Sequence, residues 1–218
     1  MAKRAKFRLR ARPLQRRRPS LDPRPRILVV CEGRITEPQY FDAFRREEEN
    51  RLVDVRIDSE GGAPKTLVER AANRKKESEE EARRARDENL KYDEVWCVFD
   101  VDEHPRLPDA RQQARDNGIN LAISNPCFEL WLLLHFREQN AHIERKAVAT
   151  LLKKHIRNYR KHVSFETLRD GYLEAVQRAQ QLDRRHADVG TEGDNPSTNV
   201  YILTECIREF GRKFRSHS

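Results

Sequence analysis

The sequence predicts an α/β domain in which helices flank a mostly parallel sheet of about four strands. Two of the expected strands, at 27–31 and 95–99, are unbroken apolar runs, which is typical of strands buried on both faces of a parallel sheet. Helical segments separate the four expected strands and are long enough for right-handed parallel crossovers. In such a sheet the residues that follow the strands gather along one edge, where ligands bind.

Length and composition permit one folded domain with an appended tail. Of the 218 residues 37% are charged, and the mean hydropathy is −0.94, yet strong hydrophobic periodicity argues against general disorder. Residues 1–26 contain eleven Lys or Arg and one Asp, so they carry about +10 and the rest of the chain about −2. We therefore expect a disordered basic tail at 1–25, an α/β domain at 26–142 and a helical C-terminal region at 143–218.

The basic tail has two interpretations. It binds nucleic acid through phosphate contacts without reading sequence, or it only keeps the chain in solution. No segment approaches the roughly 18 apolar residues of a membrane span, and no apolar region of a secretory signal follows the basic start. The four cysteines form no CxxC pair, so we expect reduced thiols in a soluble, cytoplasmic protein with no membrane contact.

The first strand is followed by a helix start. Thr36 is the expected N-cap and Pro38 lies in the first turn, so the helix should run to about residue 50. Alternating apolar residues at 53–57 predict a strand at the edge of the sheet. A helix with a largely charged outer half is expected over 65–90, and this outer half is either solvated or docks a partner.

The later elements follow from apolar spacing and turn residues. The pattern predicts the strand at 95–99, a helix at 108–117 that Gly118 ends, a strand at 120–124 and a buried helix within 128–136. Beyond residue 143 we expect three amphipathic helices, no strand, and a polar loop at 186–199. The first of these helices has a basic face, which is either solvated or an anion-binding wall.

Acidic residues follow two of the apolar strands. Glu32 comes after the first strand, and Asp100 and Asp102 come after the third. Asp100 and Asp102 are two positions apart, so they point to the same side of the chain where the extended geometry persists. Three carboxylates at neighbouring strand ends form a pocket of hard oxygen ligands suited to Mg²⁺ or Mn²⁺. Isolated acidic turns are the alternative interpretation, because strand ends often carry turn-forming acids.

Three nearby residues are candidates for an accessory role. His104 is a possible proton shuttle, although a lone histidine in a loop is more often neither base nor ligand. Glu129 either closes the pocket or caps the helix that follows it, and Asn125 lies at the end of the fourth strand. Tyr40, on the first helix, is interpreted as a packing residue.

Four motifs in this order resemble the RloB-like proteins, relatives of the abortive-infection protein AbiLii. They are CEGRITEPQYF at 31–41, VFDVDEH at 98–104, SNPCFELWLLLHF at 124–136 and NPSTNVYIL at 195–203. The first two motifs also resemble the Glu and Asp-x-Asp elements of the Toprim fold, which topoisomerases, primases and nucleases share. The resemblance covers most of the chain from residue 26 onward and implies that the α/β domain is Toprim-like, a Rossmann-like arrangement.

The same resemblance implies roles for the acidic residues. Glu32 would be a metal ligand and the catalytic acid or base, and Asp100 and Asp102 would be catalytic residues that hold Mg²⁺. Toprim sequences often carry an Asp shortly after the Glu-Gly pair. Here Glu37 stands in that region, so the resemblance assigns it no direct role.

The resemblance also implies a setting in anti-phage defence, in abortive infection, with an ATPase partner protein. The chain has no Walker motif, so that partner would supply any nucleotide hydrolysis. We expect a metal-dependent nuclease-like effector that hydrolyses phosphodiester bonds in DNA or RNA. The alternative is a non-catalytic regulatory subunit of an ATPase-containing defence complex, one that binds nucleic acid or metal.

Overall fold

The structure is a computed structural model that describes residues 25–48, 54–58, 63–101, 107–156, 159, 164–191 and 193–215. Its strands are β1 (Arg26–Cys31), β2 (Asp54–Asp58), β3 (Glu94–Asp100), β4 (Asn120–Asn125) and β5 (Ser197–Thr198). Its α-helices are α1 (Thr36–Glu47), α2 (Pro64–Ala85), α3 (Leu107–Asp116), α4 (Glu129–Leu134), α5 (Arg145–His155), α6 (Tyr172–Val189) and α7 (Val200–Arg215). Three short 3-10 helices are η1 (Glu88–Leu90), η2 (Phe165–Thr167) and η3 (Arg169–Gly171).

The predicted fold class is confirmed: the sheet is mostly parallel, with four parallel strands and one short antiparallel strand, and helices flank it. The strand order is β2-β1-β3-β4-β5, in which β1 pairs with β2 and β3, and β3 pairs with β4, all in parallel. The strand expected at 53–57 is β2, and it lies at one edge as predicted. β5 pairs antiparallel with β4 at the other edge, so the prediction that no strand follows residue 143 is wrong.

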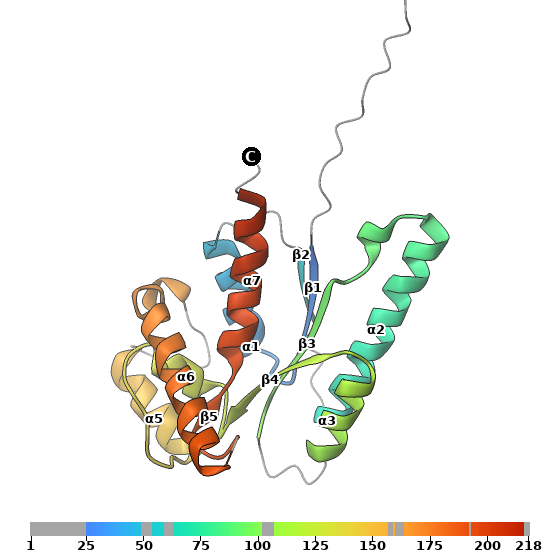
Figure 1. The fold of residues 1–218 in the computed structure, drawn as a ribbon. Coiled ribbons are helices and arrows are strands. Elements are labelled where there is room, and N and C mark those ends of the chain that lie inside the picture. The colour runs from blue at the N-terminus through green and yellow to red at the C-terminus, as the bar shows by residue number, and fades with distance from the viewer. Residues whose placement is uncertain are drawn as a thin grey trace, which may run out of the picture.

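Helices cover both faces of the sheet (Figure 1), and each face has its own hydrophobic core. On one face, side chains from β1, β3 and α2 pack with those of α3, and Leu28, Val30 and Phe99 are among them. On the opposite face, α1, α4, α6 and α7 cover the sheet around Tyr40 and Trp131, which are almost fully buried. The prediction that Tyr40 is a packing residue is therefore confirmed.

Several boundaries differ from the sequence-based expectation. The N-cap residue of α1 is Ile35, and Thr36 is already the first helical residue, so the prediction that Thr36 is the N-cap is wrong. The helix expected to reach residue 90 ends as α2 at Ala85, where Arg86 adopts a left-handed conformation, and η1 follows. The loop expected at 186–199 is partly helical, because α6 continues to Val189.

The chain folds so that strand order reverses between β1 and β3. From β1 the chain passes through α1 to β2 at the edge, and then returns through α2, across the other face, to β3 on the far side of β1. A crevice at the carboxyl ends of β1 and β3 follows from this reversal, and ligands of open α/β sheets bind at such a point. Among the described residues no helix is long and apolar enough to cross a membrane, and the four cysteines form no disulfide.

Candidate functional site

Glu32 and Asp100 lie side by side at the carboxyl ends of β1 and β3. The β1–β3 ladder continues one residue past β1, because the Glu32 amide donates to the Val98 carbonyl at 2.8 Å. The Glu32 carboxylate then accepts a hydrogen bond from the Asp100 amide at 3.1 Å. The structure thus brings together two of the three acids that the sequence placed in one pocket.

The Asp100 carboxylate is bound by groups from two other segments. One oxygen accepts a hydrogen bond from the Phe128 amide at 2.8 Å, just before α4. The other forms an ion pair with Arg145, at the start of α5, over 2.8 Å. The Arg145 side chain is 47% exposed and that of Asp100 is 13% exposed, so solvent reaches this ion pair from the arginine side.

A cavity of about 320 Å³ opens at this point and contains further acids. We call it the acidic pocket, after its carboxylates Glu32, Glu37, Asp100 and Glu129. Arg34 and Arg145 also line it, so two guanidinium groups face four carboxyl groups. With all four carboxyl groups ionised, four negative charges would face two positive ones, and each proton that a carboxyl group keeps reduces this excess.

Glu37 is almost fully buried in the first turn of α1, over the turn that follows Glu32. A Cβ added at Gly33 would overlap the Glu37 carboxyl group, so glycine is what allows this side chain to lie against the turn. Burial raises the pKa of Glu37, and the neighbouring Glu129 and Glu32 carboxylates raise it further, while backbone amides at Glu37 and Gly33 oppose the rise.

The pKa of Asp100 is also raised, to about 8. Loss of water around the buried carboxyl group is the main cause, and the negative charge of Glu37 adds to it. Arg145 lowers this pKa but does not offset the other two effects. Carboxyl groups gathered in one pocket repel one another unless a proton or a cation joins them, and below its pKa of about 8 Asp100 keeps a proton.

Glu129 lies in the pocket, at the first residue of α4. Its carboxylate accepts a hydrogen bond from the Tyr159 hydroxyl at 3.2 Å, and burial together with the Glu129 charge raises the pKa of Tyr159. Asn125 points elsewhere: its amide donates to the Gly193 carbonyl at 2.9 Å and ties the end of β4 to the turn before β5. Asp102 and His104 lie outside the described residues.

The residues present fit a hard divalent cation in chemistry. Among the described residues no three His, Cys, Asp or Glu side chains form a ready group that could hold a metal ion, and Asp102 is not among those residues. The donors that do meet here are carboxylate oxygens, which Mg²⁺ and Mn²⁺ prefer. Glu32 and Asp100 are the described residues best placed to hold such an ion, because both line the acidic pocket and the Glu32 carboxylate accepts a hydrogen bond from the Asp100 backbone amide.

Two residues of the pocket were missed in the sequence. Glu37 was assigned no direct role, although its position four residues after Gly33 at a helix start, with a negative side chain toward the helix N-terminus, was a usable signal. Arg145 was not singled out, because it lies 45 residues from Asp100; the only signal was the basic face of its helix, for which an anion-binding wall was one interpretation.

Comparison with known proteins agrees with the motifs. The model of the RloB-like protein family matches residues 27–207, which run from the second residue of β1 through the first half of α7. No curated protein and no solved structure matches the chain.

Proposed function

Because this chain belongs to the RloB-like protein family, we propose that it is a metal-dependent nuclease-like effector that hydrolyses phosphodiester bonds in DNA or RNA. The observation that carries the proposal is the meeting of Glu32 and Asp100 at the reversal of strand order, inside a cavity that four carboxyl groups and two arginines line. Catalytic residues of α/β proteins concentrate at such strand ends.

Glu32 and Asp100, together with Asp102, would hold Mg²⁺ or Mn²⁺. When bound, such an ion neutralises charge on a phosphoryl oxygen and lowers the pKa of a coordinated water. The Toprim resemblance gives Glu32 the proton-transfer role, and its carboxylate lies at the open edge of the sheet where a water can reach it.

Arg145 is suited to the phosphate of the substrate. Its guanidinium enters the pocket from α5, pairs with a carboxylate of the site, and remains about half exposed. Arginine donates two parallel hydrogen bonds to phosphate as readily as to carboxylate. We assign it the binding of the scissile phosphodiester, where it would stabilise the charge that develops as the bond breaks.

The wider setting belongs to the same proposal. The family resemblance supports a role in anti-phage abortive infection with an ATPase partner protein. The lack of a Walker motif in the sequence supports a division of labour in which nucleotide hydrolysis belongs to the partner.

A non-catalytic regulatory subunit is the second candidate. The ion pair between Arg145 and Asp100 favours it, since an arginine that neutralises the pocket permanently would leave no place for a metal ion. In that case the acidic pocket would only stabilise the fold, and nucleic acid would bind elsewhere on the chain.

Cleavage by the purified protein separates the two candidates. The wild type would be incubated with single-stranded DNA, duplex DNA, tRNA and single-stranded RNA, each with Mg²⁺, Mn²⁺ or EDTA. The proposal predicts cleavage of at least one substrate with a divalent cation and none with EDTA. Absence of cleavage in every mixture, with and without the ATPase partner, would support the regulatory subunit instead.

A further inference from the structure

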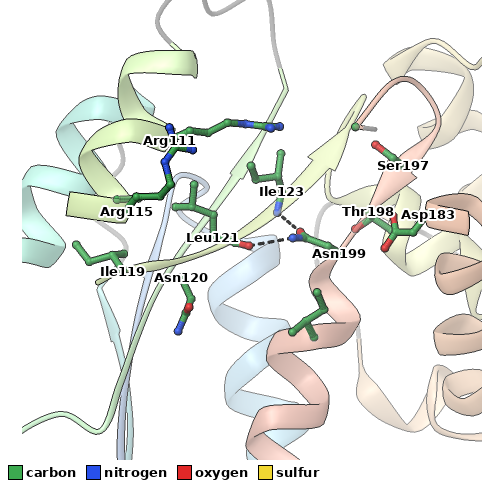
Figure 2. A pocket seen from close by; sticks show the side chains of 13 residues that line it. Arg111, Arg115, Ile119, Asn120, Leu121, Ile123, Asp183, Ser197, Thr198 and Asn199 are labelled. Carbon is green, nitrogen blue, oxygen red and sulfur yellow. Dashed lines mark hydrogen bonds between the residues drawn. The ribbon is translucent and has the colours of Figure 1, made fainter. Parts of the chain in front are cut away.

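We propose that a second cavity, between α3 and the β5–α7 segment, binds a nucleotide through its phosphate and its base. The cavity has a volume of about 460 Å³, within the usual range for small-molecule sites. It lies at the β4 edge of the sheet, and we call it the β4 groove (Figure 2). Its main lining residues are Arg111, Arg115, Leu121, Ile123, Ser197 and Ile202.

One wall of the β4 groove is cationic. Arg111 and Arg115 are four residues apart on α3, so both guanidinium groups face the groove. The Nε atom of Arg111 is buried, and within the described part of the chain it has no hydrogen-bond partner. A buried donor without an acceptor costs stability unless something else accepts its hydrogen bond, so Arg111 points to an anion.

The opposite wall supplies a hydroxyl group. Ser197, in β5, is only 6% exposed, and its hydroxyl group faces the groove across from Arg111 (Figure 2). Nη2 of Arg111 lies 3.4 Å from the position that a Cβ would take at Gly193, so the arginine reaches the turn that leads to Ser197. A phosphate between these walls would accept bonds from the guanidinium and the hydroxyl together.

The floor of the groove is aliphatic. Leu121 and Ile123 of β4 lie beneath the arginines (Figure 2), and Ile202 of α7, which is 42% exposed, also lines the groove. A groove lined by two arginines and by aliphatic side chains suits a ligand that is flat and apolar on one side and anionic on the other. A nucleotide combines these properties, because its base can cover aliphatic side chains while its phosphate binds arginine.

An added peptide strand is not the occupant that this edge favours. The side-chain amide of Asn199 already occupies the backbone groups at this edge of β4. Its Oδ1 accepts a hydrogen bond from the Ile123 backbone amide at 2.6 Å, and its Nδ2 donates to the Leu121 backbone carbonyl at 3.0 Å (Figure 2). The Asp183 carboxylate on the far wall is engaged by the Tyr201 hydroxyl at 2.8 Å. The groups left over are cationic and aliphatic, which matches a nucleotide.

The nucleotide has two possible sources. It is a free mononucleotide, or it is one unit of the nucleic acid that the acidic pocket cleaves; the second source rests on the proposed function. The two sites are two strands apart, since Asp100 pairs in register with Ser124 and Ser124 with Thr198.

Calorimetry in EDTA tests the groove with adenosine monophosphate, inorganic phosphate and a ten-residue oligothymidylate. Arg111→Gln removes the guanidinium, and Arg84→Gln, on the exposed side of α2, is the matched control. We expect Arg111→Gln to weaken binding of the mononucleotide or the oligonucleotide at least about tenfold, because charge-assisted bonds are the strong ones. Binding of the mononucleotide indicates a free ligand, and binding of the oligonucleotide alone indicates a substrate unit.

Photo-crosslinking of the wild type with 8-azidoadenosine monophosphate, or a photoreactive oligonucleotide if that is the probe that binds, keeps the inference testable if Arg111→Gln does not fold. Crosslinks within 119–123 or 197–202 are expected. The inference is overturned if neither nucleotide probe binds, if inorganic phosphate binds as tightly as the nucleotide, if the two arginine variants bind equally, or if crosslinks lie only elsewhere. EDTA keeps metal out of these titrations, so the inference and the nuclease proposal fail separately.

Discussion

At the residue scale, Arg145 is both a neighbour and a competitor of any cation in the acidic pocket. Arg145→Gln should raise the affinity for Mn²⁺ by up to about fivefold, because a half-exposed ion pair contributes at most about 1 kcal/mol. The same change should weaken nucleic-acid binding if Arg145 holds the phosphate. Calorimetry with Mn²⁺ measures the first effect, and Arg137→Gln, an exposed arginine after α4, is the control.

An Mn²⁺ affinity that falls in Arg145→Gln would show that Arg145 supports the metal site instead of competing with it. An unchanged affinity would show that the ion pair with Asp100 does not occupy the cation position. Unchanged nucleic-acid binding in Arg145→Gln would remove Arg145 from the proposed phosphate-binding role.

His135 should make the stability of the protein depend on pH. Its Nδ1 is bonded to the Trp131 carbonyl at 2.9 Å, its Nε2 has no partner among the described residues, and burial lowers its pKa from 6.5 to about 4. The folded state therefore binds fewer protons than the unfolded state between pH 6.5 and 4. The contribution of neutral His135 to the free energy of unfolding is therefore full above pH 6.5. It decreases by about 3 kcal/mol as the pH falls toward 4.

Chemical denaturation of the wild type and His135→Asn at several pH values measures this effect. The variant cannot titrate in this range, so its free energy of unfolding should fall less between pH 6.5 and 4. His142→Asn, at an exposed histidine, should keep the wild-type slope. Equal slopes for the wild type and His135→Asn would contradict the argument.

At the element scale, Gly171 and Gly33 each allow another group to pack directly against the backbone, and the two groups differ in how easily they can move. A Cβ at Gly171, before α6, would overlap the backbone carbonyl of His135, whereas a Cβ at Gly33 would overlap the flexible end of Glu37. Backbone cannot move aside cheaply, so Gly171→Ala should lower the free energy of unfolding by roughly 1–3 kcal/mol. Gly33→Ala should cost less but displace the Glu37 carboxyl group and weaken Mn²⁺ binding.

Urea denaturation and calorimetry on both variants measure the two effects. The expected pattern is a stability loss in Gly171→Ala with normal metal binding, and the reverse in Gly33→Ala. If Gly33→Ala leaves Mn²⁺ affinity unchanged, Glu37 takes no part in the site.

The elements also show what the sequence can and cannot predict. β1 and β3 were predictable because each is a continuous apolar run, and a strand buried on both faces requires one. β5 was not, because it consists of Ser197 and Thr198 alone; pairing with β4 and a 2.8 Å bond between the Ser124 and Thr198 hydroxyl groups hold it in place. Such a strand exists only through tertiary contact.

At the scale of the whole molecule, the residues of the candidate site also divide into those that a local sequence pattern predicts and those that depend on tertiary packing. Glu32 and Asp100 were predictable from local pattern, since each follows a buried strand and strand ends share an edge. Arg145 reaches the pocket only because α5 packs beside α4, which no local pattern encodes. The described residues of the four sequence motifs lie in or beside β1, β3, β4 and β5, which are neighbours in the sheet.

The basic tail at 1–25 gives a prediction for the full chain. Nearly all of the positive excess lies there, so it should supply salt-sensitive affinity for nucleic acid that does not depend on sequence. Deleting it should flatten the plot of log K against log salt concentration, measured by fluorescence anisotropy with a labelled oligonucleotide. An unchanged slope after deletion would favour a tail that only keeps the chain in solution.

We propose that the acidic pocket is a catalytic site and that its carboxylates are not required for folding. The initial rate of phosphodiester cleavage in Mg²⁺, compared between the wild type, Asp100→Asn and the exposed control Asp170→Asn, tests it most directly, with thermal midpoints measured alongside. We predict that Asp100→Asn stays folded and loses at least about hundredfold in rate, while Asp170→Asn keeps the wild-type rate. A folded Asp100→Asn variant that cleaves at the wild-type rate would contradict the claim.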